Sequence, residues 1–231
     1  MQGTLYIVAT PIGNLEDITL RAIRVLSSVD VILAEDTRVT GKILNSINTG
    51  DKRESGVSSK LISYHQHSGE DKKLMILKML TEGKNMALVT DAGTPGISDP
   101  GNELIAYLYE KNPQISFIPI PGPSAITASL SVCGFDINRL VFIGFMPKRK
   151  KNKLIKWLKE GNITFAYYDS PHRVIKNLLE IEKYFGKNTK VFIARELTKV
   201  YETIYRGEIE AVLKDLQKKP VKGELVVVIG R

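Results

Sequence analysis

The chain has 231 residues, of which 43% are hydrophobic and 25% are charged, and these values allow one or two globular domains. Its single cysteine, Cys133, excludes an intramolecular disulfide and a cysteine-based zinc site, and favours a reducing compartment. No apolar run approaches the ~18 residues of a membrane span, and residues 1–6 do not resemble a signal peptide. We therefore expect a cytoplasmic protein that is neither secreted nor inserted into a membrane.

Positive charge is concentrated in the second half of the chain. Residues 1–119 carry 12 basic and 14 acidic side chains, a net charge of −2, whereas residues 120–231 carry 21 basic and 11 acidic, a net charge of +10. This asymmetry fits a polyanionic partner that contacts mainly the second half. Solvated surface lysine explains the same charge without any partner, so the count alone leaves both interpretations open.

The first half repeats one pattern, in which a short apolar strand, a loop rich in Gly, Pro or Asp, and an amphipathic helix follow one another. We expect strands over residues 5–9, 31–34, 61–64, 86–90 and 116–120. Asp17 or Thr19 is expected to cap the first helix, with Leu20, Ile23 and Leu26 on its buried face. Strands without in/out alternation, separated by helices, predict a mostly parallel sheet covered on both faces.

The second half is predicted to be a further α/β domain, so that the domains span residues 1–119 and 120–231, with proline marking the boundary. Its expected strands are 141–145, 163–168, 191–194, 202–206 and 225–229, and its expected helices lie around 154–158, 174–181 and 211–216. The polar segment 49–59 contains two glycines and is the candidate for a mobile loop.

Loops that follow the predicted parallel strands are the candidate ligand site, because helix N-termini and loop N–H groups converge at that edge of a sheet. The sequences are PIGN at 11–14, DAGTPGISDPG at 91–101 and PGPS at 121–124. Glycine lets the backbone approach a ligand closely, and Asp91 is available for a ribose hydroxyl or an amine. Turn chemistry explains each loop alone, but three loops together favour a nucleotide-like ligand.

Several common sites are not indicated. The chain contains neither the G-x-G-x-x-G of a Rossmann site nor the Walker A sequence of a P-loop. His65 and His67 alternate at the end of a strand, an arrangement that rarely chelates a metal alone, so we expect no metal site. Cys133 lies in a stretch of small and apolar residues and is predicted to be a packed core thiol.

Six motifs together carry a family resemblance that spans nearly all of the chain. They are TPIGNLEDIT at 10–19, AEDTR at 34–38, DAGTPGISDPG at 91–101, PGPSA at 121–125, SPHR at 170–173 and RELTK at 195–199. In this order, they resemble the branch of the tetrapyrrole methylase superfamily that methylates small-subunit ribosomal RNA. The first and third motifs are highly specific to that branch.

The resemblance implies two α/β domains of the tetrapyrrole methylase type, which are class III S-adenosylmethionine-dependent methyltransferases, with the cofactor in the cleft between the domains. It also implies a homodimer and transfer of a methyl group to the ribose 2′-OH of a cytidine in the decoding region of 16S ribosomal RNA. Many relatives continue with a helical segment beyond the position of Arg231. If that segment helps to hold RNA, docking here must rely on other surfaces.

The expected site residues come from these motifs and their neighbours. The cofactor-binding candidates are Pro11, Gly13, Asp91, Ala92, Gly93, Ile97, Ser98, Ser124 and Ala125. Gly93→Val is expected to abolish cofactor binding and leave the fold largely intact. The catalytic candidates, one of which would help the hydroxyl to lose its proton, are Glu35, Asp36, Arg38, Glu196 and Lys199. A structural Asp36–Arg38 ion pair and a solvated charged turn at 195–199 are the alternatives.

The expected RNA-binding residues form two groups, Lys148, Arg149, Lys150, Lys151 and Lys153 in one and His172 and Arg173 in the other. Like charges packed as closely as the first group repel one another, and a polyanion would relieve that repulsion. The second group begins a helix and could hold a phosphate there, although helix capping explains it equally well.

Two other functions remain open. One is a methylase of a small tetrapyrrole, although a net charge of +10 over residues 120–231 suits a long polyanion better than a single macrocycle. The other is a non-catalytic RNA-binding module on the same fold, although a pure binder has no need for cofactor loops.

Overall fold

The computed structural model describes residues 2–47 and 59–231, so the predicted mobile segment lies outside the described residues except for Ser59. The chain divides into two compact units, Met1–Ser124 (unit 1) and Ala125–Arg231 (unit 2). The boundary expected after residue 119 falls inside a strand, β5 (Ser116–Ile120), and the structural division follows Ser124. Within the described ranges, no helix is long and apolar enough to cross a membrane.

Unit 1 is built on a five-stranded sheet in the order β3-β2-β4-β1-β5, and every neighbouring pair is parallel. With β5 given above, the strands are β1 (Thr4–Val8), β2 (Val31–Ala34), β3 (Lys60–Ser63) and β4 (Met86–Val89). All residues of β2 and β4 are buried, as is required of central parallel strands that are covered on both faces. The prediction of a parallel sheet is confirmed.

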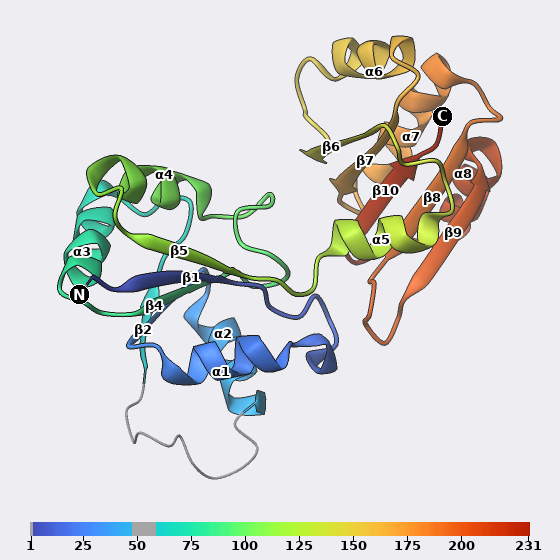
Figure 1. Ribbon diagram of the computed structural model, residues 1–231. Coiled ribbons are helices and arrows are strands. Elements are labelled where there is room, and N and C mark those ends of the chain that lie inside the picture. The colour runs from blue at the N-terminus through green and yellow to red at the C-terminus, as the bar shows by residue number, and fades with distance from the viewer. Residues whose placement is uncertain (1, 48–58) are drawn as a thin grey trace. The chain divides into compact units, whose positions relative to one another are not determined.

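Helices cover both faces of this sheet (Figure 1). They are η1 (Leu15–Asp17), α1 (Leu20–Ser28), α2 (Thr37–Ile47), α3 (Glu70–Thr81) and α4 (Asn102–Lys111). Residues of α1 and α2 form one core with the sheet, including Leu26 and Leu44. Residues of α3 and α4 form a second core on the opposite face, including Leu80 and Leu104. Each face of the sheet therefore has its own hydrophobic cluster.

The start of α1 confirms one expectation and corrects another. The Thr19 hydroxyl accepts a hydrogen bond from the Ala22 N–H at 3.1 Å, so Thr19, one of two predicted caps, is the cap. The predicted buried face is wrong at Leu20, which is 85% exposed. With 3.6 residues per turn, Leu20 lies ~140° around the helix from the buried Val25 and faces solvent instead.

Unit 2 has a mixed sheet in the order β6-β7-β10-β8-β9. The strands are β6 (Leu140–Phe145), β7 (Thr164–Asp169), β8 (Lys190–Arg195), β9 (Thr203–Glu208) and β10 (Leu225–Ile229). Only the β6–β7 pair is parallel, and the other three pairs are antiparallel. The antiparallel pairs arise because the short connection 196–202 joins β8 to β9 as a hairpin and because β10 inserts between β7 and β8.

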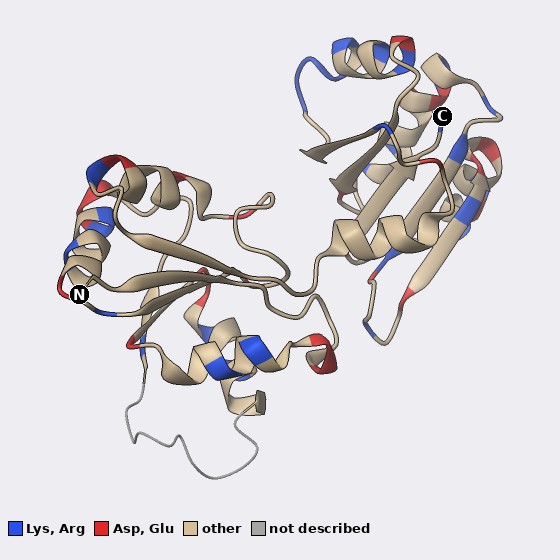
Figure 2. Cartoon of the chain, viewed as in Figure 1, with Lys and Arg blue, Asp and Glu red and all other residues tan. Residues whose placement is uncertain are grey.

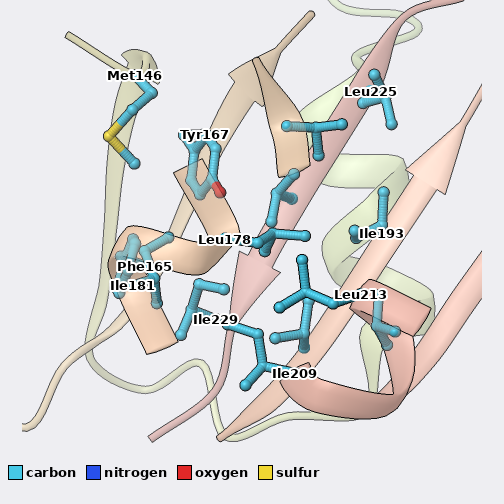
Figure 3. Packing of buried hydrophobic residues seen from close by; sticks show 14 of the residues in the cluster. Met146, Phe165, Tyr167, Leu178, Ile181, Ile193, Ile209, Leu213, Leu225 and Ile229 are labelled. Carbon is cyan, nitrogen blue, oxygen red and sulfur yellow. The ribbon is translucent and has the colours of Figure 1, made fainter. Parts of the chain in front are cut away.

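One helix covers one face of the unit 2 sheet and three cover the other (Figure 1). They are α5 (Ala125–Cys133) on the first face, and α6 (Lys151–Glu160), α7 (Val174–Phe185) and α8 (Ile209–Gln217) on the second. Figure 3 shows the larger core, where the Tyr167 ring is fully buried near Leu178 and Ile181. Cys133 is 1% exposed in the smaller cluster, which confirms it as a core thiol.

Candidate functional site

The loops that follow the strands of unit 1 gather at one edge of its sheet, because all five strands are parallel. These carboxyl-edge loops are residues 9–14 after β1, 35–36 after β2, 90–101 after β4 and 121–124 after β5. Sequence analysis placed most of the candidate cofactor residues in them. Their positions relative to each other follow from a set of backbone and side-chain hydrogen bonds.

Three of the carboxyl-edge loops are joined directly. Thr10 and Gly93 exchange two backbone hydrogen bonds of 2.9 and 3.0 Å, which ties the β1 loop to the β4 loop. The buried Thr10 hydroxyl also donates to the Thr90 carbonyl at 3.0 Å. Thr94 donates to the Pro123 carbonyl at 3.2 Å and so reaches the β5 loop. These hydrogen bonds fix the positions of the three loops relative to one another.

Gly93 occupies a backbone conformation that favours glycine, with φ +85°. A Cβ built there would lie 3.4 Å from Ile12 Cγ2 and 3.8 Å from the Pro123 carbonyl oxygen, which are ordinary contact distances. Space alone would permit a small side chain, but a β-branched residue is strained at positive φ. Gly93→Val is therefore expected to strain the loop after β4 in addition to its effect on cofactor binding.

Three carboxylates lie together at this edge, Glu35 and Asp36 after β2 and Asp91 after β4. Glu35 Oε2 accepts the Thr90 hydroxyl at 2.6 Å and the Asp91 N–H at 3.4 Å. Asp91 Oδ1 accepts the Asp36 N–H at 3.0 Å. Partial burial raises the pKa of Asp91, and the charges of Glu35 and Asp36 add to that rise. The site therefore concentrates negative charge beside backbone N–H groups.

Arg38 is the cation beside this cluster. Its guanidinium contacts the Asp36 carboxylate at 2.6 Å, and its backbone N–H donates to Asp36 Oδ1 at 2.8 Å. Hydrogen bonds from the Arg38 side chain and backbone lower the pKa of Asp36 to about 2. Asp36 therefore remains a carboxylate and is a weak base. The Arg38 side chain is 86% exposed, so its outer face is open to a second anionic group.

The other predicted cofactor residues follow the same loops. Pro11 is buried, whereas Gly13 and Ala92 are exposed. Ile97 is 43% exposed, and Ser98 adopts a left-handed conformation with φ 65°. Ser124 is half-buried and is the last residue of unit 1, whereas Ala125, also half-buried, is the first residue of α5 in unit 2. These nine candidates thus do not all lie in one unit.

Glu196 and Lys199 belong to unit 2 and form a closed network with Glu224. The Lys199 ammonium lies 3.0 Å from Glu196 Oε1 and 2.8 Å from Glu224 Oε2. Partial burial alone would raise the pKa of Glu196, but hydrogen bonds from the Glu224 N–H and Lys199 lower it overall. Burial alone would lower the pKa of Lys199, and its two carboxylate partners raise it. Both changes oppose a role in proton removal.

The basic stretch 148–153 covers the end of the loop after β6 and the first residues of α6, and Figure 2 shows Lys and Arg along the loop before α6. Lys148, Arg149, Lys150 and Lys153 are exposed. Lys151 differs, because its side chain is 12% exposed and its ammonium lies 2.8 Å from Asn177 Oδ1 and 2.5 Å from Glu180 Oε2. This corrects the expectation that folding gains nothing from these charges, and it removes Lys151 from the RNA-binding set.

The pair at 172–173 is also divided by the structure. His172 is exposed, whereas the Arg173 guanidinium donates to the Met146 carbonyl and ties the start of α7 to the end of β6. Nearby, Asn177 donates to the buried Asp169 carboxylate at 2.7 Å and accepts from Lys151. Burial raises the pKa of Asp169 despite the hydrogen bonds from Asn177 and Ser170. Arg173 therefore has a structural partner, and His172 stays open to a ligand.

Sequence reasoning missed the threonines that organise the carboxyl edge. Thr10 and Thr90 are each 1% exposed. Thr90 directly follows β4, and Thr10 lies two residues after the end of β1. That position was a usable signal, because a buried hydroxyl at a strand end must find a partner. No group of three or more His, Cys, Asp or Glu is arranged to hold a metal ion in the described parts of the chain.

Comparison with known proteins places this fold and site in a family. The family model described as Tetrapyrrole (Corrin/Porphyrin) Methylases matches residues 4–213. The chain therefore belongs to the tetrapyrrole methylase family, and within it to the branch whose members are named Ribosomal RNA small subunit methyltransferase I. The membership predicted from the six motifs is confirmed.

Relatives with that name cover almost the entire chain. The Synechocystis sp. protein is 42% identical over 99% of this chain and 79% of its own length. The Escherichia coli O157:H7 protein is 41% identical over 99% of this chain and 78% of its own. The Thermotoga maritima protein is 40% identical and is covered over 98% of its own length.

Solved structures give the same fold at lower identity. Cobalt precorrin-4 methyltransferase matches 98% of this chain and 94% of its own with a TM-score of 0.73 and 18% identity. Uroporphyrin-III C-methyl transferase from Thermus thermophilus, complexed with S-adenyl homocysteine, matches 99% of this chain and 98% of its own with a TM-score of 0.66 and 16% identity. The expected tetrapyrrole methylase fold is confirmed.

Proposed function

We propose that this protein transfers the methyl group of S-adenosylmethionine to the ribose 2′-OH of a cytidine in the decoding region of 16S ribosomal RNA. The observation that carries the proposal is the 40–42% identity, over 99% of the chain, to proteins named Ribosomal RNA small subunit methyltransferase I. The net charge of +10 over residues 120–231 supports a polyanionic substrate rather than a single macrocycle.

The carboxyl-edge loops fit S-adenosylmethionine, which combines an adenosine, a carboxylate and a sulfonium. Gly93 has a positive φ that favours glycine and bonds Thr10 through both of its backbone groups, which fixes the path of the loop at the exposed Ala92. The carboxylates of Asp91 and Glu35 suit a ribose hydroxyl, an ammonium or a sulfonium. We assign the cofactor to these loops, with Pro11, Gly13, Ala92, Ile97, Ser98, Ser124 and Ala125 as further contacts.

When bound, the cofactor supplies a methyl group on a positively charged sulfur, and its transfer to oxygen is an in-line displacement that requires no metal. The protein's main contribution is then orientation, which reaches roughly 7–11 kcal/mol in favourable systems. The hydrogen bonds that join Thr10, Gly93 and Thr94 to neighbouring loops support such a fixed arrangement.

Removal of the hydroxyl proton is most effective with a base whose pKa lies near the working pH. Asp36 has a pKa of about 2, and the pKa of Glu196 is also lowered. We therefore assign Asp36 and Arg38 a positioning role, in which the exposed guanidinium meets an anionic group of the substrate. Glu196 and Lys199 are assigned to holding the 195–199 turn against Glu224.

The RNA side of the proposal rests on exposed cations of unit 2. Lys148, Arg149, Lys150 and Lys153 are exposed, and so is His172 in the segment before α7. Backbone phosphates would bind them with release of counterions, which is the main source of sequence-independent affinity. We further propose that the protein acts as a homodimer, as the family resemblance implies, and in the cytoplasm, which its single cysteine favours.

The test is a map of ribose methylation. Small-subunit ribosomal RNA and assembled small subunits from cells that lack the protein are incubated with S-adenosylmethionine, with and without the protein, and digested for mass spectrometry. We expect one added methyl group on a cytidine ribose that depends on the protein. Addition of chelator should leave that product unchanged. A methyl group on a base, or none on RNA, contradicts the proposal.

A further inference from the structure

A cavity of about 480 Å³ opens in unit 2 between the β8–β9 turn and the segment that follows α8. We call it the Tyr201 pocket. Its walls include Arg195, Tyr201 and Tyr205 on one side and Lys219 and Lys222 on the other. Its volume lies within the range of roughly 300–1,000 Å³ that is usual for ligand sites. None of the predicted RNA-binding residues contributes to it.

The pocket carries a net positive charge, because four basic and two acidic side chains line it. Both acidic groups already have cationic partners: Asp215 lies 2.7 Å from Lys218, and Glu196 lies 3.0 Å from Lys199. Lys219 and Lys222 are exposed, and no carboxylate of the described residues lies within ion-pair distance of either. Two lysines are thus available to an external anion.

Arg195 joins two of the segments that line the pocket. Its guanidinium donates to the carbonyls of Lys222 at 3.1 Å and Tyr201 at 2.8 Å, and to the Thr203 hydroxyl at 2.8 Å. The β8–β9 turn and the segment after α8 are therefore joined across the pocket. Because these bonds use backbone carbonyls of Lys222 and Tyr201, both side chains can be changed without breaking them.

Tyr201 supplies an aromatic surface that the fold does not use. Its side chain is 75% exposed, whereas Tyr205 is half-buried and packs against the core of unit 2. An exposed ring beside unpaired lysines is the combination that binds single-stranded nucleic acid, where bases stack on aromatic side chains and phosphates contact cations. Lysine is depleted at protein–protein interfaces, which disfavours a protein partner.

We propose that the Tyr201 pocket binds one unstacked nucleotide of single-stranded RNA, with the base on the Tyr201 ring and the adjoining phosphates at Lys219 and Lys222. This subsite rests on the proposed RNA substrate and lies outside the carboxyl-edge loops. It is a second RNA-binding site, formed by residues other than the cations at 148–153.

The test measures binding of a fluorescein-labelled 12-nucleotide oligocytidylate by fluorescence anisotropy, without S-adenosylmethionine, across a salt series. Tyr201→Ala should weaken binding about 5-fold or more, the equivalent of one lost stacking contact, whereas Tyr201→Phe should bind like the parent. Lys219→Gln with Lys222→Gln should make the log–log salt slope shallower by about 1.4. The matched control is Lys187→Gln with Lys214→Gln, an equal charge change at two lysines paired with Glu210.

Two results would overturn the proposal. One is unchanged oligonucleotide binding by Tyr201→Ala together with equal salt slopes in the two double variants. The other is weakened binding of Tyr201→Ala to assembled small subunits but not to the oligonucleotide, which would assign the pocket to a protein. Because no methyl transfer is measured, failure here is distinct from failure of the methylation map.

Discussion

The two units are both helix-covered sheets, but they place their loops and charges differently. In unit 1 all strand pairs are parallel, so the loops after the strands meet at one edge. In unit 2 three of the four strand pairs are antiparallel, which distributes the connections to both ends of the sheet. Strand direction therefore explains why the loops of unit 1, and not those of unit 2, can gather into one ligand site.

The two units also differ in net charge. Residues 1–119 have a net charge of −2 and contain the cluster of Glu35, Asp36 and Asp91, whereas residues 120–231 have a net charge of +10. A carboxylate cluster suits the cationic part of a cofactor, and exposed lysines suit RNA phosphates. On this division, substitutions in unit 1 should change cofactor affinity and the rate of methyl transfer, and substitutions in unit 2 should change RNA affinity.

The largest effect is expected from the pair Asp36→Asn with Arg38→Ala. Loss of a positioning pair beside the reacting groups should lower the single-turnover rate of methyl transfer on the order of 10²-fold, because small misplacements are costly in an in-line reaction. Calorimetry should show an S-adenosylmethionine affinity close to that of the parent.

The control is Lys78→Ala with Glu82→Gln, which removes an exposed ion pair elsewhere in unit 1. A parental rate in the Asp36 and Arg38 variant would show that the pair is only structural. The search for catalytic groups would then move to Glu35, the remaining catalytic candidate at the same edge.

Asp91→Asn is expected to act on cofactor binding instead. The amide oxygen can still accept the Asp36 N–H, so the loop keeps its hydrogen bond while the charge is lost. Loss of one charged contact to the cofactor should lower S-adenosylmethionine affinity roughly tenfold or more in calorimetry. Asp71→Asn in α3 is the matched charge control. Equal affinities for both variants would remove Asp91 from the cofactor site.

The sequence predicted most of the fold, because apolar runs and turn residues are local signals. β2, β5 and β10 have the predicted bounds, and α7 covers the predicted 174–181 and buries Val174, Leu178 and Ile181. The antiparallel pairs of unit 2 were not predicted, since strand order depends on contacts between distant segments. The prediction for Leu20 is wrong because the buried side of α1 is centred on Ala22, Val25 and Leu26, and a pattern of leucine and isoleucine alone does not show this.

The candidate site was predictable only in part, for a related reason. Motif positions located the loops, but not which charges within them have partners. Lys151 was grouped with its basic neighbours, although Asn177 and Glu180, 26 and 29 residues further along the chain, hold it. Glu196 was proposed as a catalytic group without knowledge of Glu224. Such partners come from tertiary structure, which spacing along the chain does not reveal.

Lys151 and Lys153 in unit 2 are predicted to differ in role, one in stability and the other in RNA binding. Lys151→Gln should lower the free energy of unfolding by about 1–3 kcal/mol, because its loss leaves Glu180 without its partner in a largely buried setting. Lys153→Gln should leave stability unchanged and make the salt slope of RNA binding shallower by about 0.7. Urea unfolding and salt-dependent anisotropy distinguish the two. A reversed pattern would return Lys151 to the RNA-binding set.

The smallest expected effect is the pH dependence that Asp36 confers on unit 1. Hydrogen bonds from Arg38 lower its pKa from 3.8 to about 2, so the folded state favours the charged carboxylate more than the unfolded state does. A lowered acid pKa contributes stability above the unfolded value, and that contribution disappears as pH falls through the folded value. Asp36→Asn should therefore be slightly less stable than the parent at pH 7.

Urea unfolding from pH 7 to pH 2 measures this difference in the free energy of unfolding between the parent and Asp36→Asn. The difference should stay constant down to about pH 4 and then shrink toward pH 2, because in that range the unfolded parent binds a proton at Asp36 while the folded parent still holds the charged carboxylate. Salt at 1 M should also reduce it, since Arg38 is 86% exposed and screening is strong at the surface. A difference that persists at pH 2 would assign the stability to the hydrogen-bond geometry at Asp36 rather than to its charge.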